Sequence, residues 1–202
     1  MITFFDIETS GLDKSKHAIT QIAAVTLDRS LEVTSEFEVK VKFKLENADP
    51  EALEINSYDA DLWSEKAIPP FEAGNQFLSY LDKNKRTTLI SKKGKPYTVC
   101  TLGGHNINGF DIPFLRSWYE RLGVSWVPIQ LHGIDTYSLA MAYDFQSKQN
   151  GNDIGWKNFK LETICEHFGI PIDSHDALSD VKANCQVGKI LLSSIKPVEV
   201  SA

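Results

Sequence analysis

The 202-residue sequence has few cysteines, no long hydrophobic run and no excess of positive charge. Its three cysteines (Cys100, Cys165 and Cys185) are scattered and odd in number, which excludes a disulfide miniprotein and favours reduced thiols in an intracellular, cytoplasmic protein. The N-terminus has neither a basic leader nor a long apolar segment, so we expect no signal peptide and no membrane partner. A formal net charge of −6 argues against a protein that coats nucleic acid by charge alone.

The composition is that of an ordinary globular domain. Hydrophobic residues make up 42% and charged residues 24% of the chain, which is enough to form a core. At roughly 150 residues per domain, we expect one domain over residues 1–195 and a short tail over 196–202.

The first part of the chain has the pattern of three strands. An apolar run at 2–8 precedes Thr9-Ser10-Gly11, a second run spans 19–27, and residues 37–43 alternate between apolar and charged. Short links between the three segments predict an antiparallel meander.

From residue 50 onwards, helical patterns alternate with short strands. We expect helices from Pro50 and over 71–81, 110–122, 139–143, 161–168 and 177–195, and strands over 98–103 and 127–131. The polar segment 146–158 contains two glycines and predicts a mobile loop. This order of elements predicts an α/β fold with a mixed sheet flanked by helices.

Residues 83–99 contain six lysines and arginines, and Lys93-Gly94-Lys95 has the composition of a turn. We interpret 83–99 as an inserted basic hairpin. It could guide a nucleic-acid strand by charge, although such a cluster is more often only a solvated face.

Five residues are candidates for chemistry: Asp6, Glu8, Asp111, His175 and Asp180. Asp6 and Glu8 point to the same side of a strand, where their mutual repulsion favours a bound cation. Asp111 lies at a helix start marked by Pro113. His175 and Asp180 converge if the histidine lies in the lead-in loop and the aspartate lies one turn inside the last helix.

Each signal has a simpler explanation when it is taken alone. An Asp-x-Glu pair is expected about once by chance, Asp111 could be only a helix cap, and His175 could be only a surface residue. Together, four carboxylates at element ends suit hard divalent cations such as Mg²⁺ or Mn²⁺. The sequence contains no cysteine pair with zinc spacing, no nucleophile elbow and no P-loop.

Three segments resemble, in order, the motifs of the DEDDh exonucleases, which are relatives of the epsilon proofreading subunit of bacterial DNA polymerase III. The segments are Phe4-Phe5-Asp6-Ile7-Glu8-Thr9-Ser10-Gly11-Leu12, Gly104-His105-Asn106-Ile107-Asn108-Gly109-Phe110-Asp111-Ile112-Pro113-Phe114-Leu115 and His175-Asp176-Ala177-Leu178-Ser179-Asp180-Val181-Lys182-Ala183. The resemblance implies a ribonuclease H-like fold with a mixed five-stranded central sheet. It also implies 3′-to-5′ removal of nucleotides.

The resemblance further implies a role for each candidate residue. Asp6 would bridge two Mg²⁺ or Mn²⁺ ions, Glu8 and Asp180 would hold the ion that activates water, and Asp111 would complete the shell of the other ion. His175 would be the general base, because its ordinary pKa of about 6.5 lies close to working pH.

Substrate contacts are also implied by the resemblance. The backbone of Thr9 and Ser10 would meet the terminal nucleotide, and Leu12 would wedge beside the last base. Asn106 could hydrogen-bond near the phosphate. Two alternatives stay open, because Leu12 could be a buried turn residue and Asn106 could only satisfy its own loop. We interpret His105 as structural.

We therefore predict a metal-dependent 3′–5′ exonuclease that converts single-stranded or frayed DNA 3′ ends to nucleoside 5′-monophosphates. The alternatives are an RNA-trimming enzyme of the same fold, an internal nuclease, and a non-catalytic module that binds nucleic acid or a polymerase. A polymerase or homodimer partner stays open.

Overall fold

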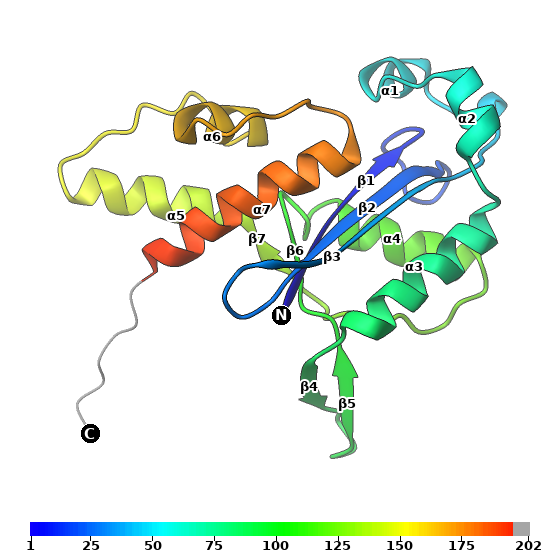
Figure 1. Ribbon diagram of the computed structural model, residues 1–202, viewed down its shortest axis with the longest axis horizontal. Helices are drawn as coiled ribbons and strands as arrows, with labels where there is room; N and C mark the ends of the chain where they lie inside the picture. The colour runs from blue at the N-terminus through cyan, green and yellow to red at the C-terminus, as the bar shows by residue number, and fades with distance from the viewer. Residues whose placement is uncertain (196–202) are drawn as a thin grey trace.

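The computed structural model describes residues 1–195, which form an α/β fold around a five-stranded sheet (Figure 1). The predicted tail at 196–202 lies outside the described residues. The spatial order of the strands is β3 (Val33–Lys40), β2 (Ile19–Leu27), β1 (Ile2–Thr9), β6 (Leu102–Gly104) and β7 (Ile134–Asp135). The first three pair antiparallel, and β6 and β7 continue the sheet parallel to β1. The predicted mixed sheet is confirmed.

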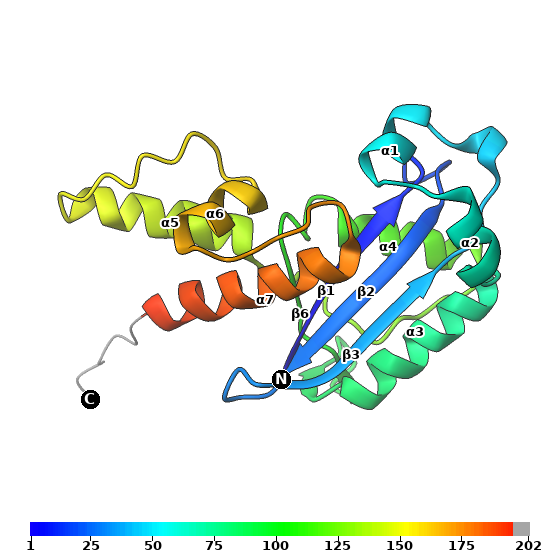
Figure 2. The same ribbon diagram turned by 45° about the horizontal axis from the view of Figure 1, so that its top comes forward.

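Helices cover both faces of this sheet (Figures 1 and 2). Their bounds are α1 (Pro50–Ile55), α2 (Ala60–Lys66), α3 (Pro70–Asn84), α4 (Asp111–Arg121), α5 (Thr136–Gln149), α6 (Leu161–Phe168) and α7 (Ala177–Ser194), with a 3₁₀ turn at Leu45–Asn47. Helices α3 and α4 pack against the face that carries Phe5 and Ile7. Helix α7 packs against the opposite face, on Phe4 and Val25. Helices α5 and α6 extend that layer by packing on α7.

Both faces of β1 are apolar because both are covered. Alternate side chains point to opposite sides of a strand, so Phe4 contributes to one core cluster and Phe5 to the other. Gly188 lets α7 lie directly on β1, since a Cβ at this position would come within 2.5 Å of the Phe4 ring. The close approach fixes the path of α7, which carries Asp180 in its first turn.

Several predicted elements differ from the structure. The third strand spans Val33–Lys40 instead of 37–43, because its pairing with β2 ends at Lys40. The predicted strand at 127–131 makes a single bridge, from Ile129 to Cys100, and the fifth strand is Ile134–Asp135. Helix α5 continues to Gln149, into the segment that we expected to be a loop.

The predicted basic hairpin is present over 87–99, whereas residues 83 and 84 of the predicted range belong to α3. Strands β4 (Thr87–Ile90) and β5 (Pro96–Val99) pair antiparallel around a turn in which Gly94 has a φ of 72°. Figure 1 shows the hairpin projecting beyond the end of the sheet at which β1 begins. The predicted strand at 98–103 is divided, because Val99 belongs to the hairpin and Leu102 to the central sheet.

None of the helices within residues 1–195 is both long enough and apolar enough to cross a membrane.

Candidate active site

Three of the five candidate residues meet at the end of β1. Asp6 and Glu8 lie two residues apart on this strand, and Asp180 approaches from α7. One carboxylate oxygen from each of the three lies within 4.8 Å of the other two. Glu8 is buried, with 7% of its surface exposed. The strand and the helix thus bring together the carboxylates that the sequence placed 170 residues apart.

Asp111 lies beside this group of three without belonging to it. Helix α4 begins at Asp111, and the Asp111 carboxylate accepts the backbone N–H of Ile7 at 3.3 Å. Ile7 lies between Asp6 and Glu8, so this hydrogen bond ties the start of α4 to the acidic end of β1. The carboxylate is 4% exposed and therefore serves β1 instead of acting as a solvent-facing helix cap.

His175 and Asp180 converge through a loop and a helix, as their spacing requires. His175 lies before α7 in a left-handed conformation, with a φ of 70°, and its backbone N–H donates to Asp180 Oδ2 at 3.1 Å. Asp176 caps α7 by accepting the N–H of Ser179 at 3.0 Å. The His175 side chain is exposed, at the edge of the carboxylate group.

Burial raises the pKa of all four carboxyl groups, and neighbouring carboxylates of the site add to the shift of Asp6 and Glu8. Burial, followed by the charges of Asp111 and Glu8, raises the pKa of Asp6 well above its ordinary value. Burial and the charge of Asp180 raise the pKa of Glu8 to about 8. Burial likewise raises the pKa of Asp111 to about 7 and that of Asp180 to about 6. Raised pKa values show that these buried carboxylates have too little positive charge nearby to neutralise them.

The donor set fits divalent cations. Asp180 Oδ1 is buried and has no hydrogen-bond partner, which is unusual for a buried carboxylate oxygen. The group offers only carboxylate oxygens, the ligands that Mg²⁺ and Mn²⁺ prefer. Positive charge at this point would supply Asp180 Oδ1 with a partner and reduce the repulsion.

The pKa shifts predict how the metal-free protein responds to pH. The pKa of Glu8 rises from an ordinary value of 4.5 to about 8 in the folded chain, and that of Asp180 rises from 3.8 to about 6. Between the ordinary and the folded pKa of each group, the folded chain therefore binds more protons than the unfolded chain. Stability therefore falls as the pH rises through this window. In EDTA the melting temperature should fall by roughly 5 °C or more from pH 5 to pH 8, and Mg²⁺ should restore it. A melting temperature that rises over this pH range in EDTA would contradict the raised pKa values of Glu8 and Asp180.

The predicted substrate residues lie on the turn after β1. Leu12 is 81% exposed, so the buried-turn interpretation of this residue is wrong. The carbonyls of Thr9 and Ser10 already accept hydrogen bonds, from Asn56 Nδ2 at 2.9 Å and from the backbone N–H of Asp49 at 2.8 Å. These bonds hold the segment around α1 against the turn.

The loop before α4 is held by a residue whose function the sequence did not reveal. Asp135 Oδ1 accepts the backbone N–H of exposed Asn106 at 2.9 Å and also that of Tyr137 at 3.0 Å. Asp135 caps α5 through the bond from Tyr137, so one carboxylate joins the loop before α4 to the start of α5. His105 is structural, because its ring nitrogens bond to Thr136 Oγ1 at 3.1 Å and to the Phe159 carbonyl at 2.9 Å.

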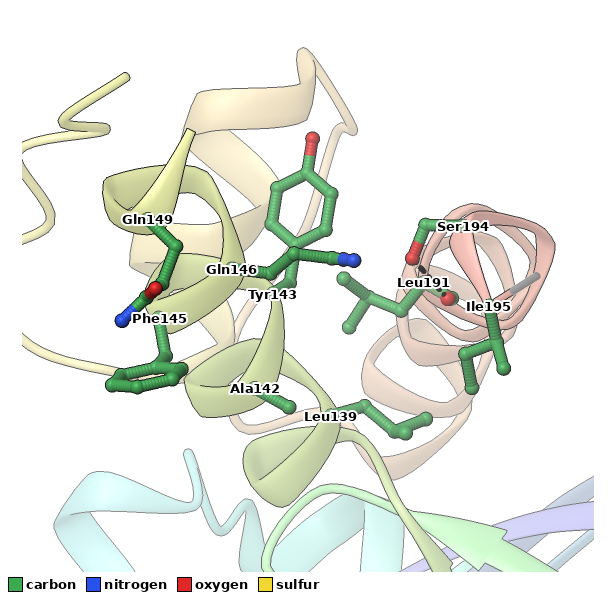
Figure 3. Close-up of a pocket in the computed structure, with 9 residues that line it drawn as sticks. All are labelled: Leu139, Ala142, Tyr143, Phe145, Gln146, Gln149, Leu191, Ser194 and Ile195. Carbon is green, nitrogen blue, oxygen red and sulfur yellow. Dashed lines mark hydrogen bonds between the residues drawn. The ribbon is translucent and has the colours of Figure 1, made fainter. Parts of the chain in front are cut away.

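A separate hollow between α5 and α7 is not part of this site. Figure 3 shows its lining, which is mainly apolar and includes Leu139, Tyr143, Phe145 and Leu191. Among the described residues, no carboxylate lines it.

Comparison with known proteins agrees with this geometry. The chain matches the model of the RNase T exonuclease family over residues 3–89 and 97–187. The chain belongs to this DEDDh exonuclease family. The match to the exonuclease model leaves out residues 90–96, the tip of the β4–β5 hairpin.

Relatives of this exonuclease include enzymes named for RNA and for DNA. It is 24% identical to Ribonuclease T of Haemophilus influenzae strain PittGG, over 95% of this chain and 79% of the relative. Ribonuclease T of Yersinia pseudotuberculosis serotype O:1b is 28% identical over 92% of this chain and 80% of its own length. DNA polymerase III PolC-type of Caldanaerobacter subterraneus is 26% identical over 98% of this chain, which spans only 12% of that polymerase.

Solved structures share the fold of this exonuclease. A structure of exonuclease I superposes with a TM-score of 0.72 at 21% identity, over 95% of this chain and 40% of the other. Exonuclease I of E. coli in complex with a dT13 oligonucleotide gives a TM-score of 0.70 at 21% identity, over 94% of this chain and 40% of the other.

Proposed function

We propose that the protein is a metal-dependent 3′–5′ exonuclease that releases nucleoside 5′-monophosphates, with single-stranded or frayed DNA ends as the favoured substrate. The observation that carries this proposal is the meeting of Asp6, Glu8 and Asp180 within 4.8 Å, beside Asp111 and His175, in a chain of the exonuclease family. Retention of all five chemical groups argues against a non-catalytic module that only binds nucleic acid or a polymerase.

The chain supplies ligands and a base for phosphodiester hydrolysis. Two bound Mg²⁺ or Mn²⁺ ions would stabilise the negative charge that builds on the attacking and leaving oxygens. Asp6 would contact both ions, Glu8 and Asp180 would hold one of them, and Asp111 would help to hold the other. His175 is exposed at the edge of the group, where its imidazole can take the proton of the attacking water.

The turn after β1 is the proposed contact for the terminal nucleotide. Leu12 offers an exposed apolar side chain that can pack against any base, which suits an enzyme without sequence preference. Thr9 and Ser10 shape this turn, and Asn106 offers an exposed amide on the other side of the site.

DNA and RNA each have support among the relatives. DNA is favoured by the PolC-type polymerase relative and by the fold shared with exonuclease I, which was solved with dT13. RNA trimming is the second candidate, because the Ribonuclease T relatives align over 79% and 80% of their own length. We also propose an intracellular location, since all three cysteines are buried free thiols.

Product analysis tests this proposal. The protein is incubated with DNA and RNA of equal sequence, labelled at the 5′ end, in Mg²⁺, in Mn²⁺ or in EDTA. We expect a ladder that shortens one nucleotide at a time from the 3′ end in either metal, faster on DNA, and no products in EDTA. Internal cuts, or binding without products, would contradict the exonuclease proposal, and faster shortening of RNA would favour the second candidate.

A further inference from the structure

Three hollows adjoin one another on the surface that leads from the second motif past α4. The first has a volume of about 390 Å³, and its lining includes Lys14 and Asn108, the latter from the second motif. It shares Arg116 and Leu131 with a second hollow, which in turn shares Trp126 with a third. The row therefore begins beside the candidate active site and continues toward the hairpin, since the second hollow also includes Tyr97 of β5.

The first hollow has the polar groups of a phosphate site. Arg116 Nε is buried without a hydrogen-bond partner, while Nη2 of the same guanidinium donates to the Gln130 carbonyl at 3.1 Å. Buried N–H groups normally have acceptors, and a guanidinium fork suits phosphate oxygens. Lys14 adds a second cation, and within the described residues Glu120 is the one carboxylate that lines this hollow.

The second and third hollows offer surfaces for bases. Trp126 is 56% exposed and Tyr97 is 39% exposed, although large aromatic side chains are usually buried. Aromatic faces stack on any unpaired base, which contributes about 1–3 kcal/mol per base. The order along the surface is thus a cationic hollow followed by aromatic side chains.

Positive charge is clustered in the hairpin, at the far end of this surface, and in the residues next to it. Residues 83–110 contain six lysines and arginines and no aspartate or glutamate, so with a total of −6 the rest of the chain carries −12. Lys92, Lys93 and Lys95 are exposed and make no ion pair within the described part of the chain. A positively charged segment in an otherwise acidic chain favours an anionic partner at that segment.

We propose that this surface, from Lys14 and Arg116 past Trp126 to the β4–β5 hairpin, is a binding track for single-stranded nucleic acid. The track would hold the part of the substrate strand that lies 5′ of the cleaved nucleotide, so the inference rests on the proposed exonuclease function. Cations would bind its phosphates, and the exposed aromatic rings would bind its unpaired bases. The family match omits residues 90–96, so the tip of the hairpin is a feature of this chain beyond the shared family pattern.

Two variants of the track and one matched control test this inference. The hairpin variant combines Lys92→Gln, Lys93→Gln and Lys95→Gln, and the stacking variant is Trp126→Ala. The control combines Lys42→Gln, Lys44→Gln and Lys66→Gln, three exposed lysines outside the track, and loses the same charge. Binding of a fluorescent oligodeoxynucleotide of about 20 nucleotides is measured in EDTA over a range of salt concentrations. Cleavage in Mg²⁺ is measured on the same oligonucleotide and on one of about 4 nucleotides, which is too short to reach the hairpin.

The hairpin variant should bind the long strand at least about 10-fold more weakly, and its slope of log K against log salt should fall by about 2, since each phosphate contact contributes about 0.7. Trp126→Ala should weaken binding about 5- to 150-fold, the equivalent of about 1–3 kcal/mol, with little change in the salt slope. Both variants should cleave the short oligonucleotide like the wild type.

Equal binding of the long strand by the wild type and the two track variants would overturn the inference, as would an equal loss in the control. Failure of the wild type to cleave either oligonucleotide in Mg²⁺ would instead overturn the exonuclease proposal, so the two failures are separable.

Discussion

Asp6→Asn is expected to lower the rate of Mg²⁺-dependent nucleotide release by more than about 10⁴-fold, beyond the usual range for loss of a general base. Asp6 has the central position, because its carboxylate interacts with those of Asp111, Glu8 and Asp180. An asparagine keeps the shape of the side chain and removes the negative charge that would hold both ions. The rate is measured by release of mononucleotides under single-turnover conditions. Asp61→Asn, an exposed residue on α2, is the matched control and should keep full activity.

The same substitution should stabilise the metal-free protein. Removing one charge from a buried acidic group relieves repulsion, so the melting temperature of Asp6→Asn in EDTA should exceed that of the wild type by roughly 2–4 °C. Addition of Mg²⁺ should stabilise the wild type and leave the variant unchanged. Full activity in Asp6→Asn, or a lower melting temperature in EDTA, would show that the carboxylates do not share a metal site.

His175→Ala is expected to lower the rate about 10²- to 10⁴-fold while metal affinity is kept. The imidazole is exposed, and it is not one of the three candidate metal ligands whose atoms lie within 4.8 Å of one another. If it takes the proton of the attacking water, the variant should lose the pH dependence that a general base gives to the wild-type rate, which a pH–rate profile measures. His167→Ala, an exposed histidine on α6, is the control.

Two other outcomes would revise the role of His175. A variant with normal activity would show that water is deprotonated without this side chain. A variant that no longer binds Mn²⁺ would show that the residue acts in the metal site and not as a base.

Much of the site could be predicted from local spacing. Alternation along a strand places Asp6 and Glu8 on one side, and the five-residue spacing of His175 and Asp180 requires a loop before a helix, which the structure contains. What local spacing could not show is how Asp111 reaches the strand. That contact depends on a hydrogen bond to Ile7 across 104 residues of sequence.

The sheet edges were predicted less well for a physical reason. The alternation of residues 37–43 continues past Lys40, but from Val41 the chain pairs with Ile68, so the register with β2 ends at Lys40. Apolar residues at 127–131 resemble a strand, yet the chain joins the sheet only after Gly133, where an added Cβ would come within 2.8 Å of the Leu102 carbonyl. Pairing of this kind is a property of the neighbouring strand and is not encoded in the segment itself.

Asp135 and Leu12 show the same limit within the site. Asp135 caps α5, but its bond from the Asn106 N–H also requires that the loop before α4 lie beside the end of β7, which no local pattern shows. Exposure of Leu12 likewise follows from the path of the turn and not from its hydrophobicity.

The most direct test of the account is the number of Mn²⁺ ions bound per chain, measured by electron paramagnetic resonance in the presence of a nucleoside 5′-monophosphate. The account predicts about two ions for the wild type and for His175→Ala, and a loss of both from Asp6→Asn. Binding of no Mn²⁺ by the wild type, or equal binding by Asp6→Asn, would contradict the claim that these carboxylates form a metal centre.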